Sequence, residues 1–252
     1  VPRRIGAAVP GHGAAANPIL ALDASALEEG VGAVFPGIPF AIGNAVAAHA
    51  ALQLQADGAA VERHLFLHLG HGVGGAWVEP QALAEPIRPI EIGHVVLGLD
   101  GPLCRCGHRG CLEAVASTRA LALLCDMPEA GLVAAGADWP AIVGLTPARE
   151  AALRQVLTQL GVAIGNALNV MPVPRVVISG WPASLPDALR DAVREGLSRS
   201  LFGAPGLGVP LRFLLSATGT EPRPALAFAM HDLVRAGGMP SPARDATGRL
   251  AG

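Results

Sequence analysis

The amino-acid sequence predicts an α/β fold. Short apolar runs, typical of strands, alternate along the chain with longer segments rich in alanine and leucine, typical of helices. Most connections between helices and strands in the second half are short, as in a packed unit. The 252 residues are 51% hydrophobic and 15% charged, which is enough for a large core in one broad domain or two lobes.

Up to residue 79, the pattern predicts strands, one helix and a hairpin. The Ala/Leu-rich helical segment contains no glycine or proline, and a glycine-rich turn separates two strands that we expect to be antiparallel. In order, the elements are a strand at Arg4–Val9 closed by Pro10-Gly11, a strand at Pro39–Ile42, a helix at Ala45–Ala56, a strand at His64–Leu69, a turn at Gly70–Gly75 and a strand at Ala76–Glu79.

After residue 79, a proline-rich loop and an extended segment lead into a cysteine cluster, and helices and strands then alternate. Two of the helices have a proline in the first turn, where it is well tolerated. In order, we predict a loop at Pro80–Pro89, an extended segment at Glu91–Leu99, a helix at Leu112–Leu124, a connection at Ala130–Pro140, a helix at Thr146–Leu168, a strand at Arg175–Ile178, a helix at Leu185–Leu201, a strand at Leu211–Ser216, a helix at Ala225–Arg235 and a flexible tail at 236–252.

Composition and charge exclude several classes of function. The net charge is −2 and only Arg3-Arg4 pairs two arginines, so the chain lacks the basic surface of a DNA-binding module. Its apolar runs are broken well before the roughly 20 residues of a membrane span, and no signal peptide is visible. These observations predict a cytoplasmic protein without a membrane partner. The absence of an initiator Met leads us to expect further N-terminal sequence.

Three of the four cysteines lie within eight residues and predict a structural zinc site. Zinc favours four tetrahedral ligands, and three thiolates with one imidazole form a common closed set. The glycines between the cysteines let the loop fold back on itself, and a histidine can approach from the preceding segment. The predicted ligands are His94, Cys104, Cys106 and Cys111. The alternatives are unliganded thiols, or His108 in place of His94. Cys125, on an apolar helical segment, is expected to be a buried core thiol.

The sequence from Glu91-Ile-Gly-His94 through Cys104-Arg-Cys-Gly-His-Arg-Gly-Cys-Leu-Glu113 resembles the signature of the ROK family of bacterial sugar kinases and sugar-responsive repressors. Val9-Pro-Gly11 resembles the early glycine turn of that family. Leu69–Gly75 resembles its second phosphate loop, and Gly161–Asn169 followed by Val176–Gly180 resembles its late helix–strand unit. The resemblance extends from about Arg4 to Val234.

This resemblance implies the actin-like, ribonuclease-H-like ATPase architecture, with sugar bound between two α/β lobes. The whole chain, 1–252, would be an N-terminally incomplete ROK domain. One lobe would span about 1–65 with part of the C-terminal helix region, and the other about 66–235. The resemblance further implies that Asn44, Glu91 and Glu113 bind the sugar, with His94 beside it while it ligates zinc. Without the motif, either carboxylate would be interpreted as a solvated surface group.

Two departures from the family pattern bear on catalysis. ROK kinases have an Asn-Asp pair that supplies the base for the sugar hydroxyl, and here the pair is Asn44-Ala45. The family's Gly-Thr-Gly phosphate loop is Gly70-His-Gly72 here, so Gly70, Gly72, Gly74 and Gly75 are interpreted as a vestigial phosphate loop or a plain glycine-rich hairpin. A third departure is Ile90, where the family has glycine. The resemblance leads us to expect the first phosphate loop of the family N-terminal to Val1.

These features predict the sugar-sensing, dimerising effector region of a ROK transcriptional regulator without kinase activity. It would bind a sugar or sugar phosphate and contact DNA only through an N-terminal winged helix-turn-helix. The alternatives are an active ROK sugar kinase with another base, or a degenerate domain that binds no ligand. His12, His49, His64 and His68 are interpreted as surface or satisfied core histidines, and the tryptophans as packing residues.

Overall fold

The computed structural model describes residues 4–9, 23–57, 62–82, 85–203, 208–215, 224–226 and 229. These residues form a parallel two-stranded sheet, β1-β2, and a five-stranded sheet of order β5-β4-β3-β6-β7. In the larger sheet, β3, β6 and β7 are parallel, whereas β4 is antiparallel to β3 and β5. The strands are β1 (Ile5–Val9), β2 (Phe40–Asn44), β3 (His64–Leu69), β4 (Val73–Val78), β5 (Ile87–Ile90), β6 (Val176–Gly180) and β7 (Leu211–Leu214).

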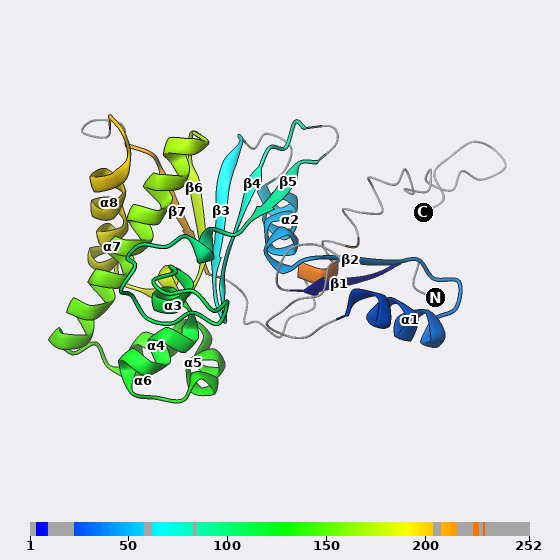
Figure 1. Cartoon of the computed structure of the whole chain (residues 1–252), viewed down its shortest axis with the longest axis horizontal. Coiled ribbons are helices and arrows are strands. Elements are labelled where there is room, and N and C mark those ends of the chain that lie inside the picture. Colours follow the sequence, from blue (N-terminus) through cyan, green and yellow to red (C-terminus); the bar gives the residue numbers. More distant parts are fainter. Residues whose placement is uncertain are drawn as a thin grey trace, which may run out of the picture.

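Helices cover both faces of the larger sheet, which confirms the predicted α/β class (Figure 1). The α-helices are α1 (Ala24–Val34), α2 (Ala45–Asp57), α3 (Glu113–Ala116), α4 (Thr118–Cys125), α5 (Glu129–Ala135), α6 (Trp139–Val143), α7 (Pro147–Val170) and α8 (Asp187–Ser200). Short 3₁₀ helices are η1 (Ile92–His94), η2 (Gly136–Asp138) and η3 (Trp181–Ser184). None of the described helices combines the length and the apolar character required to cross a bilayer.

Two hydrophobic clusters divide the core between the faces of the larger sheet. Leu65, Leu67 and Leu69 of β3 point into a cluster with α7 and α8. Phe66, between them, points to the other face and packs with the alanine-rich helix α2. This alternation is the period of two expected of a strand buried on both faces. Helices α7 and α8 approach so closely that a Cβ at Gly161 would lie 2.1 Å from the Val193 carbonyl oxygen.

The predicted hairpin exists, but its second strand begins earlier than predicted. Strand β4 starts at Val73, so the turn is limited to residues 70–72. Strand β5 overlaps the end of the segment predicted as a proline-rich loop, and Pro89 pairs in it opposite Ala76. Proline is tolerated there because β5 is at the edge of the sheet, where one side of the strand needs no hydrogen-bond donor.

Several helix predictions were incomplete. Helix α1 was not predicted, although Asp23 caps it by accepting hydrogen bonds from the backbone of Ser25 and Ala26. The predicted helix at 112–124 is broken at Ser117, whose backbone is extended and whose hydroxyl caps α4. The segment predicted as extended after Glu91 contains η1. The predicted connection at 130–140 overlaps α5 and α6.

Parts of the predictions fall on residues that are not described. Of the predicted final helix at 225–235, residues 225, 226 and 229 are helical and the others lie outside the described residues. The turn at Pro10-Gly11 and the tail at 236–252 also lie outside them. The predicted lobe boundary near residue 65 stays a prediction.

Candidate functional site

Residues 70–75 comprise the turn between β3 and β4 and the first three residues of β4, and we call them the glycine hairpin. Three structural elements pack against it. A Cβ at Gly74 would lie 3.1 Å from Val46 Cβ at the start of α2. A Cβ at Gly72 would lie 2.6 Å from the Oε2 atom of Glu113, and one at Gly75 2.9 Å from Ile92 of η1. The glycines therefore let α2, α3 and η1 approach the hairpin, which is a steric reason for a glycine-rich sequence.

Glu113 begins α3 and is anchored to the hairpin. Its Oε2 atom accepts a hydrogen bond of 2.9 Å from the Val73 backbone N–H. The other end of α3 is fixed as well, because the buried indole of Trp181 donates a 2.9 Å hydrogen bond to the Ala116 carbonyl. Two residues further on, the backbone N–H of Thr118 donates a 2.8 Å hydrogen bond to the Gly70 carbonyl. Short as it is, α3 is thus held at both ends.

Asn44 ends β2 and caps α2. Its side-chain oxygen accepts hydrogen bonds from the backbone N–H groups of Val46 (2.8 Å) and Ala47 (3.1 Å), the usual geometry of an asparagine N-cap. Because Val46 lies against Gly74, the cap also fixes the Asn44 side chain close to the glycine hairpin.

The Glu91-Ile-Gly-His94 segment packs against the same part of the hairpin. A Cβ at Gly93 would lie 2.0 Å from the Val73 carbonyl oxygen, so only glycine allows η1 to lie this close to β4. The Nε2 atom of His94 is 3.9 Å from a Glu91 carboxylate oxygen. The four predicted sugar-binding residues therefore lie in, or at the N-terminus of, elements that contact residues 72–75 of the hairpin, and their role stays a prediction.

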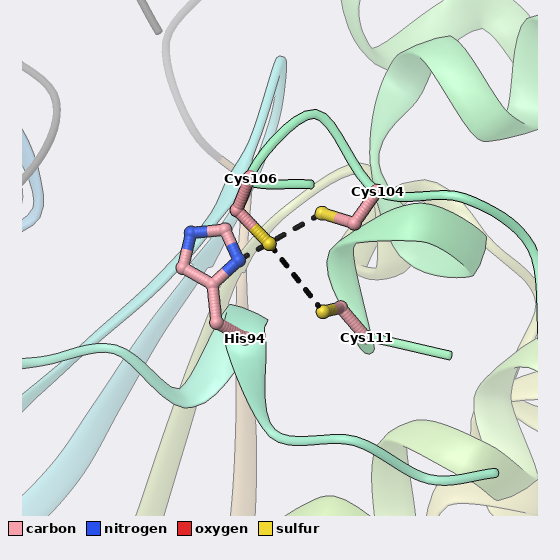
Figure 2. Close-up of side chains that lie close together, drawn as sticks. All are labelled: His94, Cys104, Cys106 and Cys111. Atoms are coloured by element: carbon pink, nitrogen blue, oxygen red, sulfur yellow. Dashed lines mark hydrogen bonds between the residues drawn. The ribbon is translucent and has the colours of Figure 1, made fainter. Parts of the chain in front are cut away.

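The side chains of the predicted metal ligands point toward one another (Figure 2). Their ligand atoms all lie within 4.8 Å of one another. The Cys106 and Cys111 sulfurs are 3.7 Å apart, and the Cys104 sulfur is 3.8 Å from His94 Nδ1. A tetrahedral zinc site with ordinary bond lengths has S···S edges of about 3.8 Å and N···S edges of about 3.6 Å. The donor set and its spacing fit such an ion, and the four residues could hold a metal.

The electrostatics of the thiols favour a bound cation. Burial raises the pKa of the Cys111 thiol to about 12 and also raises that of Cys104. The backbone N–H of His108, by contrast, is the main cause that lowers the pKa of Cys106 to about 6. A cation among the sulfurs would supply the positive charge that buried thiolates need. The alternative ligand His108 lies 3.7 Å from Cys106 but does not belong to the four-residue cluster.

The loop between the cysteines folds back through glycines in conformations that other residues rarely adopt. Gly107 and Gly110 have φ angles of +93° and +73°. A Cβ at Gly110 would also lie 1.7 Å from the Gly98 carbonyl oxygen. These two positions bring Cys111 back toward Cys104 and Cys106, as the sequence predicts.

With this geometry in view, the chain can be compared with known proteins. Residues 21–218 match the sequence model of the ROK family. The chain belongs to the ROK family. It is 23% identical over 153 residues to a xylose repressor of Caldicellulosiruptor bescii, covering 55% of this chain and 38% of the repressor. It is 51% identical over 57 residues to a glucokinase of Thermotoga maritima, covering 22% of this chain and 18% of the glucokinase.

Solved ROK structures share the fold. A ROK hexokinase of Thermus thermophilus superposes with a TM-score of 0.64 at 25% identity, covering 90% of this chain and 78% of the hexokinase. A ROK transcriptional regulator, a homologue of the E. coli MLC protein, gives a TM-score of 0.63 at 22% identity, covering 85% of this chain and 57% of the regulator. The fold is therefore that of ROK sugar kinases, in the actin-like ATPase class. The chain spans less than two thirds of the length of the repressor and glucokinase that it matches.

Carboxylate groups from two helices contact the glycine hairpin or its turn. His71, at the turn, is 69% exposed in its side chain, and its Nδ1 atom lies 3.0 Å from a carboxylate oxygen of Glu129 in α5. The Thr118 hydroxyl donates a hydrogen bond of 3.1 Å to the same oxygen. With Glu113 bound to Val73, two carboxylates lie against the hairpin, where a phosphate group would meet like charge.

Sequence reasoning did not foresee a pair of histidines beside the hairpin. The rings of His49, on α2, and His68, on β3, stack with centroids 4.0 Å apart and planes 11° apart. The two residues are 19 positions apart on different elements, so no local spacing signals their contact. A hollow of about 670 Å³ at the opposite end of β3 and β4, bordered by Glu62, Glu79 and Pro174, contains none of the predicted site residues.

Proposed function

We propose that this ROK chain is the sugar-sensing, dimerising effector domain of a transcriptional regulator and has no kinase activity. The observation on which the proposal depends is Ala45, the first residue of α2, directly after the Asn44 cap. ROK kinases resemble this chain at that position but have aspartate, which accepts the proton of the sugar hydroxyl. Alanine cannot accept a proton.

No other residue of α2 supplies the missing carboxylate beside the hairpin. The only acidic residue of the helix is Asp57, at its far end. Both Asp57 carboxylate oxygens bind Arg212, at 2.8 and 2.9 Å, and one accepts a 2.7 Å hydrogen bond from Gln53. These contacts lower the pKa of Asp57 despite its burial. Asp57 therefore stabilises the far end of the helix, where it is of no use as a catalytic base.

The hairpin contacts also favour a protein that does not use nucleotide. A kinase needs donors that neutralise the β- and γ-phosphates. Here His71 stands where the family has threonine, and it contacts the carboxylate of Glu129. That carboxylate opposes the approach of a triphosphate. This contact supports the interpretation of the glycine hairpin as a vestigial phosphate loop.

The sugar ligand is proposed from the chemistry that gathers at the hairpin. Carboxylates and amides bind vicinal hydroxyls well, and Glu91, Glu113 and Asn44 offer both types of group. The Glu113 anchor on Val73 uses one oxygen and leaves its partner oxygen to accept a hydroxyl hydrogen bond. A structural zinc ion on His94 and the three cysteines would keep the segments that bear Glu91 and Glu113 in a fixed arrangement.

The proposal assigns effector sensing to this chain and DNA contact to a separate winged helix-turn-helix segment. The match to a xylose repressor and the fold shared with a ROK regulator support this division. The proposed regulator is a cytoplasmic homodimer. A bound sugar would regulate it only if the sugar has different affinities for two conformations of the protein. The described helices contain no candidate membrane span.

Turnover and ligand binding, measured on the same samples, test the proposal. The protein is incubated with ATP, Mg²⁺ and each of a panel that includes glucose, xylose and N-acetylmannosamine, and ADP release is measured. We expect no turnover above a blank without protein, and a rise in melting temperature with at least one sugar. Sugar-dependent ADP release would refute the regulator proposal. No response to any sugar would favour a degenerate domain.

An active sugar kinase is the second candidate. The 51% identity to the Thermotoga maritima glucokinase over 57 residues and the superposition on a ROK hexokinase favour it. It requires a proton acceptor other than residue 45. Sugar-dependent ADP release that is abolished by Glu113→Gln would support this candidate.

A further inference from the structure

The three cysteines of the metal cluster differ in their access to solvent. Cys104 and Cys111 are buried, with exposed fractions of 4% and 0%, whereas Cys106 is half-buried. The residues on either side of Cys106 are exposed, and a Cβ added at Gly107 would meet no atom within 4 Å. Open space therefore adjoins one of the three sulfurs, and a small solute in water can reach it while the other two are covered.

A second thiol lies within reach of the accessible one. The Sγ atoms of Cys106 and Cys111 are 3.7 Å apart, and Figure 2 shows the two side chains directed toward each other. The four residues between them begin with Gly107, whose φ of +93° and open surroundings leave its backbone free to adjust. The sulfurs can therefore approach to the length of a disulfide bond, about 2.05 Å.

Cys104 is the competing partner for Cys106. Arg105 alone separates the two, so a disulfide between them would close a small ring and require the backbone of all three residues to rearrange. That backbone is held in a turn, because the Cys104 N–H donates to the His108 carbonyl at 2.8 Å and the Gly107 N–H donates to the Cys104 carbonyl at 3.0 Å. The geometry favours Cys111 as the partner.

Hydrogen peroxide is small enough to use the open side of the cluster. The Cys106 thiolate attacks one peroxide oxygen, so that an S–O bond forms, the O–O bond breaks and hydroxide leaves. The sulfur loses two electrons and becomes a sulfenic acid, while the peroxide is reduced. The Cys111 thiolate then attacks the Cys106 sulfur, the S–S bond forms, the S–O bond breaks and a second hydroxide leaves. Two thiolates and one peroxide thus give one disulfide and two hydroxides.

This oxidation would remove two of the four ligands of the predicted ion. A disulfide is not a thiolate ligand, so only His94 and Cys104 would remain. The cluster joins two segments, because His94 is three residues after Glu91 and Cys111 is two residues before Glu113. Without the ion, nothing in the cluster would tie the imidazole to the cysteine loop, and the two carboxylates would be less firmly held relative to each other.

Backbone contacts keep the two segments attached when the ion is absent. The Leu97 N–H donates a 2.8 Å hydrogen bond to the Gly110 carbonyl, and the Leu112 N–H donates a 3.0 Å hydrogen bond to the Val95 carbonyl. Neither bond involves a sulfur, so oxidation would loosen the segments without separating them. A change of this kind can be reversed when a thiol reduces the disulfide and zinc returns.

We propose that Cys106 is a peroxide-sensitive thiol, whose oxidation to a Cys106–Cys111 disulfide releases the zinc ion of the cluster and weakens sugar binding through Glu91 and Glu113. The last step, but not the oxidation itself, rests on the proposed sugar-sensing function. The regulator would then respond less to its sugar under oxidising conditions and recover after reduction.

The experiment uses the full chain loaded with zinc and treated with hydrogen peroxide. Zinc release is followed with a chromogenic chelator, and the joined cysteines are identified by mass spectrometry after alkylation and trypsin digestion. Arg105 and Arg109 place the three cysteines of the cluster in different tryptic peptides, so each pairing is read directly. Cys106→His removes the accessible thiol and keeps a four-ligand set of a common structural type. Cys125→Ala is the control, because it removes a buried thiol outside the cluster.

We expect wild type and Cys125→Ala to release about one zinc ion per disulfide and to join the peptides that contain Cys106 and Cys111. Dithiothreitol with added zinc should restore both proteins. Cys106→His should release zinc at least about tenfold more slowly, because its remaining thiols are buried. Zinc retained by oxidised wild type, equally fast release from Cys106→His, or a disulfide to Cys104 would overturn the assignment. If Cys106→His takes up no zinc, the peptide pairing in wild type decides.

Calorimetric titration of glucose, xylose and N-acetylmannosamine into reduced and oxidised wild type tests the last step. We expect oxidation to weaken binding by about tenfold, as the loss of one hydrogen bond to a carboxylate would. Unchanged affinity after complete zinc release would overturn the proposed regulation. Disulfide formation and zinc release in a protein that binds none of the sugars before oxidation would support the thiol site and refute sugar sensing.

Discussion

The substitution Gly72→Ala tests whether the glycine hairpin serves to admit Glu113. The added Cβ would lie 2.6 Å from Glu113 Oε2, whereas real Cβ contacts are essentially never under 3.0 Å. The carboxylate must therefore move by at least 0.4 Å, away from the Val73 N–H that it now binds at 2.9 Å. The glutamate side chain is flexible enough to move, so the cost comes mainly from the hydrogen bond.

The expected magnitude follows from two opposing contributions. A hydrogen bond to a charged group contributes about 1.5–3 kcal/mol to stability. Replacing glycine by alanine lowers the entropy of the unfolded chain and restores about 0.4–1 kcal/mol. The net loss should be about 1–2 kcal/mol, which for a chain of this size lowers the melting temperature by about 2–6 °C. Sugar binding through Glu113 should weaken at the same time.

A double-mutant cycle isolates the contact. Thermal or urea unfolding is measured for wild type, Gly72→Ala, Glu113→Ala and the double variant. Gly32→Ala in α1, where nothing lies within 4 Å of the added Cβ, is the control for the alanine substitution itself. We expect Gly72→Ala to cost much less once Glu113 is alanine. An equal cost in both backgrounds would show that residue 72 does not act through Glu113.

Three further predictions concern the metal cluster, the histidine stack and α3. Cys106→Ala should reduce the zinc content from about one equivalent to near zero by elemental analysis, whereas Cys125→Ala, outside the cluster, should keep it; full zinc content in Cys106→Ala would contradict the ligand assignment. Burial lowers the pKa of His68 to about 3, so the folded state binds fewer protons than the unfolded state between about pH 3 and 6.5. The free energy of unfolding should therefore fall as the pH drops through this window, by up to about 1.4 kcal/mol per pH unit from this residue. Urea titrations of His68→Phe should show a shallower loss, and an unchanged slope would argue against the shift. Trp181→Phe should destabilise the protein by about 1–2 kcal/mol more than Trp139→Phe, because the Trp181 indole donates to a carbonyl of α3 while that of Trp139 is buried without a partner; equal losses would remove the hydrogen bond as the cause.

The sequence predicted the strands and helices whose signals are local. The apolar run at β3 and the proline-led helix α7 appear where expected, because periodicity and first-turn proline act within a few residues. Helix α1 was missed although Asp23 is a regular N-cap residue. Strand β5 was missed because Pro89 argued against a strand, although proline is tolerated in a strand at the edge of a sheet.

The metal cluster was predictable for a similar reason. Its three sulfurs lie within one short loop, and the histidine is ten residues before the first of them. The contacts that give the hairpin its chemistry could not be predicted in this way. His49 stacks on His68 across two elements, and Glu113 reaches Val73 across forty positions. Such pairings depend on how the sheet, α2 and α3 are packed together.

The most direct test of the account is calorimetric titration of the sugars and sugar phosphates into wild type and Glu113→Gln, with zinc content and ADP release measured on the same samples. We predict that at least one of these ligands binds wild type, that Glu113→Gln weakens its binding by about tenfold or more, and that both proteins retain zinc and release no ADP. Undiminished binding to Glu113→Gln at full zinc content would contradict the assignment of Glu113 as a sugar ligand, and sugar-dependent ADP release by wild type would contradict the assignment of the chain as a sensor.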